Sequence, residues 1–194
     1  KLGVSASLIL CFLRHLSEED AFATLEAALP YREYFIGVGL DSSELGHPPE
    51  KFERVFARCR ELGLKAVAHA GEEGPPEYMW QAIDLLKVQR IDHGVACLQD
   101  PLLVAELAYT RLPLTVCPLS NIKLCVFPHL AAHNLPALLE AGLCASVHSD
   151  DPAYFGGYLN DNYVQTFAVL HLSAQQAYKL AANSIEASFA PEVD

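Results

Sequence analysis

Apolar segments of strand length alternate with segments of helical spacing along nearly the whole 194-residue chain. Short apolar runs are typical of buried strands, and apolar residues recurring every three or four positions are typical of amphipathic helices. Ser17 is the expected N-cap of the first helix and Gly63 the expected stop of the second. The pattern predicts strands over residues 5–14, 35–41, 65–72, 90–94, 114–121 and 144–149, and helices over residues 18–29, 50–62, 76–87, 100–109, 135–141, 160–172 and 174–189.

The succession of strand-then-helix units indicates a parallel sheet with right-handed crossovers. A doubly wound sheet favours a Gly-rich phosphate loop after its first strand, and neither GxGxxG nor GxxxxGK[ST] occurs in the sequence. A (β/α)₈ barrel has eight such units in about 250 residues. We therefore expect an α/β fold, a partial (β/α)₈ TIM-type barrel in which strands 3 to 8 are present and the first two βα units are missing. Residues 1–194 are interpreted as one incomplete domain.

Composition narrows the class of protein. A hydrophobic content of 52% with 19% charged residues is typical of a globular chain with a large core. The net charge of −11 argues against a nucleic-acid partner, because phosphate backbones need clustered Lys and Arg. The sequence contains neither a membrane-length apolar run nor a signal-like segment. Its six cysteines form no CxxC pair, so we expect reduced thiols in a cytoplasmic protein.

Chemically capable side chains follow the predicted strands. In a barrel the carboxyl ends of all strands meet at one face, so residues far apart in sequence would share one site. The turn Ala70–Gly71 lets the chain present a histidine and a carboxylate at the end of one strand. Histidines, an aspartate and a nearby glutamate make a credible zinc site with an acid or base. The residues concerned are Asp41, His69, Glu72, His93, Asp150 and Asp151.

Simpler interpretations remain open for several of these positions. His69 by itself could be a core histidine bonded to a backbone carbonyl. Asp41 could be an ordinary loop carboxylate, and Asp92 either a solvated charge or a partner of a catalytic residue. Cys117 is expected to be a core thiol, since nothing in the sequence marks an electropositive setting. His129 and its neighbour four residues on, His133, lack an HExxH context, so we expect a solvated pair in a loop.

Four ordered motifs resemble one known family. His69-Ala70-Gly71-Glu72, residues 90–94 (RIDHG), residues 117–121 (CPLSN) and residues 149–152 (SDDP) together resemble the adenosine/adenine deaminase family of the amidohydrolase superfamily. Residues 39–44 (GLDSSE), 46–49 (GHPP) and 149–157 (SDDPAYFGG) are similar to its adenine deaminase branch. The resemblance covers essentially the whole chain. The zinc site of cytidine-type deaminases needs HxE and PCxxC, and neither is present.

The resemblance implies a role for each candidate residue. His69 and Asp150 would be ligands of a single zinc ion, and Glu72 would donate a proton to the purine ring nitrogen beside the reacting carbon. His93 would orient or deprotonate the zinc-bound water. Asp151 would hold a ring nitrogen of the substrate, and Ser42, Ser43 and Glu44 would shape its pocket.

The sequence departs from the family pattern in two respects. Family members carry an HxH pair that supplies two more zinc ligands, and no HxH occurs among the eight histidines of this chain. We expect that pair in a missing amino-terminal part, and we expect the 194 residues by themselves to be inactive. His148 stands where the branch usually has Asn, and we expect packing or supporting hydrogen bonds for it.

The function implied by the resemblance is zinc-dependent hydrolytic deamination of adenine to hypoxanthine and ammonia, in purine salvage. The expected partner is a small-molecule purine, with no nucleic acid and no membrane; the oligomeric state is not predicted. One alternative is deamination of adenosine or of an N6-substituted aminopurine nucleoside or nucleotide. Another is a non-catalytic, truncated scaffold.

Overall fold

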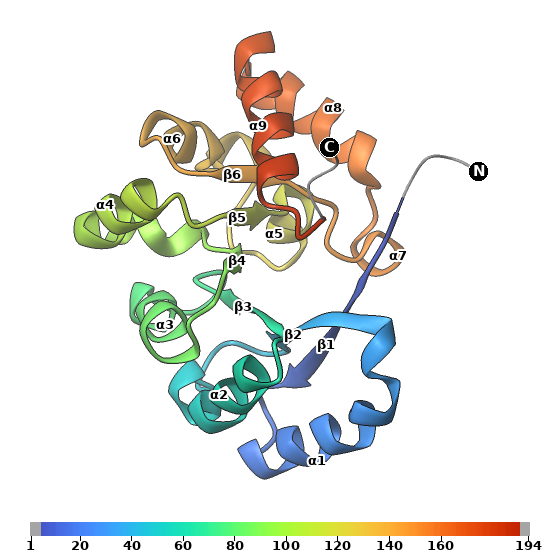
Figure 1. Ribbon diagram of the computed structural model, residues 1–194. Helices are drawn as coiled ribbons and strands as arrows, with labels where there is room; N and C mark the ends of the chain where they lie inside the picture. The colour runs from blue at the N-terminus through green and yellow to red at the C-terminus, as the bar shows by residue number, and fades with distance from the viewer. Residues whose placement is uncertain (1–4, 191–194) are drawn as a thin grey trace. The chain divides into compact units, whose positions relative to one another are not determined.

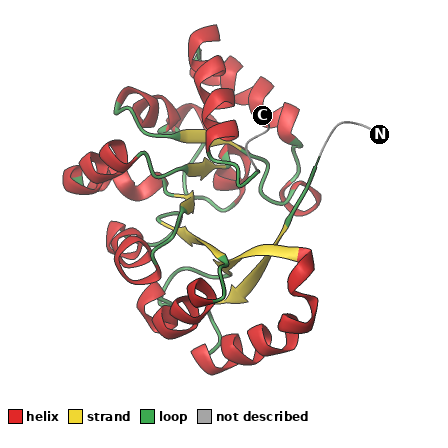
Figure 2. Cartoon of the chain, viewed as in Figure 1, coloured by secondary structure: helices red, strands yellow, loops and turns green. Residues whose placement is uncertain are grey.

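The computed structural model of the protein describes residues 5–190. The chain divides into two compact units, Lys1–Ile91 and Asp92–Asp194, which are described separately below. In both units strands are followed by helices along the chain, as Figures 1 and 2 show. Among the described residues, no helix has the length and apolar character needed to cross a membrane. The expectation that residues 1–194 form a single domain stays a prediction.

The first unit is built on parallel strands. β1 (Leu8–Leu13) pairs with β2 (Phe35–Asp41) along its whole length, and β2 pairs in parallel with β3 (Lys65–Ala70). Gly37 permits the close approach of β2 and β3, because a Cβ atom there would lie 2.8 Å from the carbonyl oxygen of Lys65. The helices that follow the three strands are α1 (Glu18–Ala28), α2 (Glu53–Glu61) and α3 (Pro76–Gln81).

The core of this unit lies between its strands and helices. The middle of β3, from Ala66 to Ala68, is buried, as a parallel strand covered on both faces requires. Phe56 of α2 is fully buried and meets Phe12 of β1 edge to face, with ring centroids 5.9 Å apart. Apolar packing therefore fixes where the carboxyl ends of β1, β2 and β3 lie, and those ends carry the polar residues.

The second unit contains another parallel pair. β5 (Leu114–Val116) pairs with β6 (Ala145–Val147) residue by residue, and β4 (Arg90–His93) ends at the start of the unit. Both β5 and β6 are buried throughout. The amide of Asn183 donates to the carbonyl oxygen of Ala145 at 2.7 Å and so ties the last helix to β6. The helices are α4 (Pro101–Thr110), α5 (Pro118–Lys123), α6 (Leu135–Glu140), α7 (Pro152–Phe155), α8 (Leu159–Leu170) and α9 (Ala174–Glu186).

Most predicted elements are present, and two of the differences occur at proline. Strand 35–41 has the predicted bounds, and Ser17 caps α1 within a reciprocal capping box. The predicted strand 114–121 is wrong after Val116, because Pro118 opens helix α5 at a position where a missing amide costs nothing. Helix α7 was not predicted; it begins in the same way at Pro152. The predicted helix 76–87 is α3 continued by a π-helical turn, Ala82–Leu86.

Candidate active site

The turn after β3 is held by a buried carboxylate. Glu44 is only 3% exposed, and its Oε1 accepts a hydrogen bond from the backbone amide of Gly71 at 2.6 Å. Its Oε2 accepts from the amides of Glu72 at 3.0 Å and Glu73 at 2.8 Å. Gly74 leaves room for this carboxylate, since a Cβ atom there would lie 2.6 Å from Oε1. Glu44 was expected to shape a substrate pocket, and in the structure it anchors the loop that carries Glu72.

A buried guanidinium joins the same strand ends. Arg14, directly after β1, is fully buried; its Nε donates to the carbonyl oxygen of His47 at 2.9 Å and its Nη1 to that of His69 at 2.7 Å. Burial lowers the pKa of Arg14, with Glu44 and Asp41 acting in the opposite direction. The Nη2 atom is buried with no hydrogen-bond partner in the described part of the chain. Sequence reasoning missed Arg14, although a charged residue ending an apolar strand is a usable signal.

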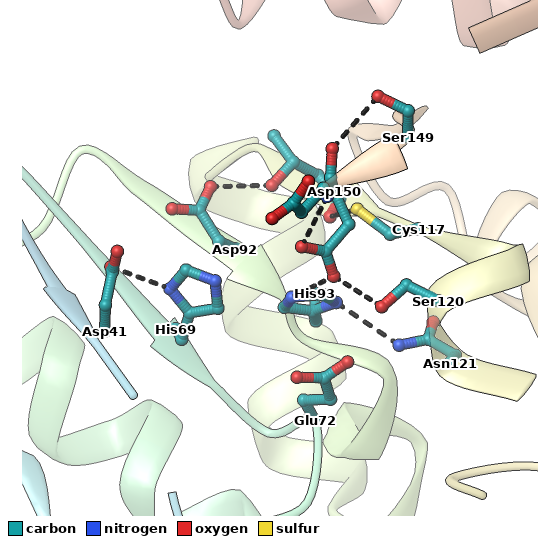
Figure 3. A network of polar contacts seen from close by, with 12 residues as sticks. Asp41, His69, Glu72, Asp92, His93, Cys117, Ser120, Asn121, Ser149 and Asp150 are labelled. Carbon is teal, nitrogen blue, oxygen red and sulfur yellow. Dashed lines mark hydrogen bonds and ion pairs between the residues drawn. The ribbon is translucent and has the colours of Figure 1, made fainter. Parts of the chain in front are cut away.

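Two hydrogen-bond acceptors near Nδ1 orient the ring of His69. Its Nδ1 lies 3.1 Å from Oδ1 of Asp41 and 3.3 Å from the carbonyl oxygen of Leu40, and Figure 3 shows the first contact. Because both neighbours accept, Nδ1 carries the proton and Nε2 is the nitrogen with a lone pair. A carboxylate behind an imidazole is the usual arrangement for a metal-binding histidine. Asp41 is therefore the partner of His69 in this unit rather than an isolated loop carboxylate.

The two serines after β2 are exposed. Ser42 has a left-handed backbone with φ of 81°, which is uncommon for a residue other than glycine. Its Oγ lies 2.7 Å from Nδ1 of His15, an exposed histidine after β1. Ser43 is also exposed, and Glu72 is half-buried. The predicted substrate-binding serines are thus at the strand-end loop, where their role stays a prediction.

In the second unit two strand-end residues meet in left-handed conformations. His93, at the end of β4, has φ of 69° and is 1% exposed; Asp150, after β6, has φ of 54°. Such conformations cost of order 1–3 kcal/mol in residues other than glycine and persist where surrounding contacts impose them. Nε2 of His93 lies 3.8 Å from Oδ2 of Asp150, and Ser120 donates to that same oxygen (Figure 3). The amide of Asp151 donates to Oδ1 of Asp150 at 2.8 Å.

The two adjacent aspartates have different surroundings. Asp150 is half-buried among the contacts just described, whereas Asp151 is exposed and caps helix α7. Oδ1 of Asp151 accepts from the amides of Ala153 at 3.1 Å and Tyr154 at 3.3 Å. The hydrogen bonds of the two neighbouring carboxylates thus show that they point in different directions.

The prediction of a solvated histidine pair is wrong for His133. His129 is exposed, but His133 is 3% exposed and its Nε2 lies 3.2 Å from Oδ1 of Asn121. The side-chain amide nitrogen of Asn121 lies in turn 3.2 Å from Nδ1 of His93. Burial lowers the pKa of His133 to about 4. Nothing in the local sequence marks His133 as buried, since the loop before α6 folds back over α5 only in the tertiary structure.

Three further residues of the second unit, Asp92, His148 and Cys117, also have contacts in the structure that bear on their predicted roles. Oγ1 of Thr115 donates to Oδ1 of Asp92 at 2.6 Å, so Asp92 is not simply a solvated charge. Oγ of Ser146 lies 2.8 Å from Nε2 of His148, which fits the expected hydrogen bonding of that histidine. Cys117 is buried as a core thiol. One ligand atom each from Cys117, His93 and Asp150 lies within 4.8 Å of the others, so this group could hold a metal ion.

Comparisons with known proteins agree on one family. The family model described as "Adenosine deaminase" matches residues 1–194. Curated relatives named adenine deaminase include those of Geotalea uraniireducens, 72% identical over 99% of this chain and 54% of the relative, and of Albidiferax ferrireducens, 70% identical over 97% of this chain and 55% of the relative. The chain thus spans about half the length of the curated relatives it matches.

Two solved structures extend the comparison. An adenine deaminase from Arthrobacter aurescens is 50% identical, with a TM-score of 0.96 over 98% of this chain and 58% of that structure. An amidohydrolase from Burkholderia ambifaria with bound Zn is 26% identical, with a TM-score of 0.91 over 98% of this chain and 54% of that structure. The predicted fold class, an α/β fold corresponding to part of a (β/α)₈ barrel, is confirmed by these matches.

If Glu44 anchors the turn after β3, changing its carboxylate should destabilise that turn. Glu44→Gln replaces one carboxylate oxygen by an amide that cannot accept, so part of the set of amides from Gly71 to Glu73 loses its partner. Leaving buried donors unsatisfied costs about 1–3 kcal/mol each. We expect a lower free energy of unfolding in the complete protein and faster hydrogen exchange at residues 71–73. Glu53→Gln, at an exposed position of α2, is the matched control; equal exchange in both variants would contradict the anchor role.

Proposed function

The chain belongs to the adenosine deaminase family, and we propose that the protein containing it is a zinc-dependent adenine deaminase. Adenine and water would give hypoxanthine and ammonia. The observation that carries the proposal is the structural match over nearly the whole chain to an adenine deaminase, with half of the residues identical. The proposed partner is a small purine, and a cytoplasmic place in purine salvage belongs to the same proposal.

His69 and Asp150 each offer a donor atom of a kind that zinc takes. Imidazole nitrogen and carboxylate oxygen are the donors that catalytic zinc takes. We assign His69, whose Nδ1 is held by Asp41, and Asp150, which Ser120 and the amide of Asp151 orient. Two further histidine ligands, expected elsewhere in the protein, are part of the proposal. When bound, zinc would supply the Lewis acidity that makes water nucleophilic at neutral pH.

The chain's own residues would perform the proton transfers and hold the substrate. Attack at the amino-bearing carbon moves electron density onto the ring, so a positioned acid is needed at the adjacent ring nitrogen. Glu72 is the proposed acid, and its backbone is fixed by Glu44. His93 would orient or deprotonate the attacking water. Asp151 would accept a hydrogen bond from the purine, and Ser42 with Ser43 would line the pocket.

One competing substrate class has an observation in its favour. An N6-methyl-AMP deaminase from Arabidopsis thaliana matches 96% of this chain with a TM-score of 0.82, at 26% identity. The same fold therefore accommodates a 6-aminopurine nucleotide in a relative. The much higher identity to proteins named adenine deaminase favours the free base for this protein. A non-catalytic scaffold is the third possibility, and it predicts no turnover of any of these compounds.

Steady-state kinetics on the complete protein separate these possibilities. We expect kcat/KM for adenine to exceed that for adenosine and for N6-methyl-AMP by at least about 10²-fold, because a pocket built for the free base leaves the ribose without room or partners. Ammonia release and hypoxanthine formation are measured together. A preference for either nucleoside or nucleotide would overturn the choice of adenine, and no turnover would favour the scaffold.

The role of Glu72 as the proton donor is tested by the isosteric substitution Glu72→Gln. Glu72→Gln keeps the backbone hydrogen bond to Glu44 but removes the acidic proton. We expect kcat to fall by about 10²–10⁴-fold, the usual effect of losing one general acid or base, with metal content unchanged. Glu73→Gln is the matched control, since its side chain is exposed and its backbone amide shares the same carboxylate. Near-normal activity of Glu72→Gln would remove Glu72 from the mechanism.

Measuring the zinc content of variants distinguishes the roles of the two adjacent aspartates. Asp150→Asn tolerates the left-handed backbone and removes the anionic ligand, so we expect loss of zinc measured by elemental analysis. Asp151→Asn should keep zinc and raise KM for adenine or lower kcat. Equal loss of zinc in both variants would mean that the ligand has been assigned to the wrong member of the pair.

A further inference from the structure

One hydrogen bond in the second unit has a donor whose identity is certain. The backbone amide of Leu135 lies 3.1 Å from Nδ1 of His133. A backbone amide can only donate, so Nδ1 of His133 carries no proton. In the neutral imidazole the proton then lies on Nε2. Burial favours this neutral form, in line with the lowered pKa of His133.

The proton position of His133 determines, through Asn121, which ring nitrogen of His93 carries a proton. With its proton on Nε2, His133 donates to Oδ1 of Asn121, and the contact is 3.2 Å long. That contact fixes which end of the Asn121 amide is oxygen, so its nitrogen is the group 3.2 Å from Nδ1 of His93. An amide nitrogen only donates, and Nδ1 of His93 is therefore an acceptor. The proton of neutral His93 must lie on Nε2, on the side of Asp150.

All three side chains are buried, so the directions of their hydrogen bonds cannot be exchanged for bonds to water. His93 is 1% exposed, Asn121 is fully buried and His133 is 3% exposed. Reversing any one link would place two donors or two acceptors face to face in the interior. An unsatisfied buried polar group costs about 1–3 kcal/mol, so the relay strongly favours one direction.

We propose that His133 and Asn121 are positioning residues that set the tautomer of His93, so that this imidazole presents an N–H at Nε2. Its catalytic consequence rests on the proposed deaminase function. Of the two roles open to His93, orienting a water or deprotonating it, the resting tautomer supports only donation to an oxygen. It also opposes metal binding through Nε2 within the group of His93, Cys117 and Asp150, since the proton would then face the Asn121 donor.

The tautomer is measured directly on the complete protein. Two-bond ¹H–¹⁵N spectra of histidine-labelled protein distinguish bare from protonated ring nitrogens, and the His93 signals are assigned by loss in His93→Gln. We expect Nδ1 of His93 to be bare and Nε2 protonated, in both the zinc-free and the zinc-loaded protein. A proton on Nδ1, or zinc bound to Nε2, would overturn the proposal.

Variants test whether Asn121 and His133 are responsible. Asn121→Asp replaces the donor by an acceptor, so His93 should move its proton to Nδ1. His133→Phe keeps a ring against Phe127, whose centroid is 4.5 Å from that of His133, but removes both hydrogen bonds. His133→Gln can still accept from Leu135 and donate to Asn121. We expect a mixed His93 tautomer in the Phe variant and the wild-type tautomer in the Gln variant.

If His93 acts in the reaction, variants that change its tautomer should also change kcat. Asn121→Asp and His133→Phe should lower kcat at least tenfold with KM nearly unchanged, and His133→Gln should retain most activity. His129→Phe, at the exposed neighbouring histidine, is the control for altering the loop. An unchanged His93 tautomer in Asn121→Asp would refute the relay. Failure of the wild-type protein to deaminate adenine would refute the proposed function and leave the spectroscopic result standing.

Discussion

A polar side chain buried at a strand end needs a partner for each of its polar atoms, and this constraint organises the structure. Burial of an unpartnered carboxylate or guanidinium costs several kcal/mol, so each such group must lie against backbone or another side chain. In the first unit Glu44 meets the constraint with three amides of one turn, and Arg14 meets much of it with carbonyl oxygens of His47 and His69. The loops after β1, β2 and β3 are consequently held to one another rather than left to the solvent.

The second unit meets the same constraint by a directional relay. The amide of Leu135 fixes His133, which fixes Asn121, which fixes His93. The left-handed backbone of His93 is tolerated because these contacts hold its side chain, and that of Asp150 because Ser120 and the amide of Asp151 hold its carboxylate. The strained conformation of His93 is thus sustained by hydrogen bonds that originate at Leu135, the first residue of α6, 42 residues further along the chain.

The two strand-end imidazoles are supported differently, and the difference suits different tasks. His69 has a carboxylate behind Nδ1, which favours a proton there and makes Nε2 a better ligand. His93 has an amide donor behind Nδ1, which leaves Nε2 as an N–H donor. Within the proposed function, an imidazole would therefore serve as a metal ligand in one unit and as a hydrogen-bond donor in the other.

The alternation of strands and helices could be predicted from the sequence, because apolar periodicity depends only on neighbouring residues. The sequence also identified His69, Glu72, His93 and Asp150 as candidates, since their motifs follow predicted strands. Arg14 was missed although its place at the end of an apolar strand is a signal. The sequence could not identify His133 as a buried partner, nor Glu44 as an anchor for amides 27 to 29 residues away. Those assignments depend on which loops fold back onto which strand ends, and only tertiary packing decides that, because a hydrogen bond between distant segments leaves no periodic trace in the sequence.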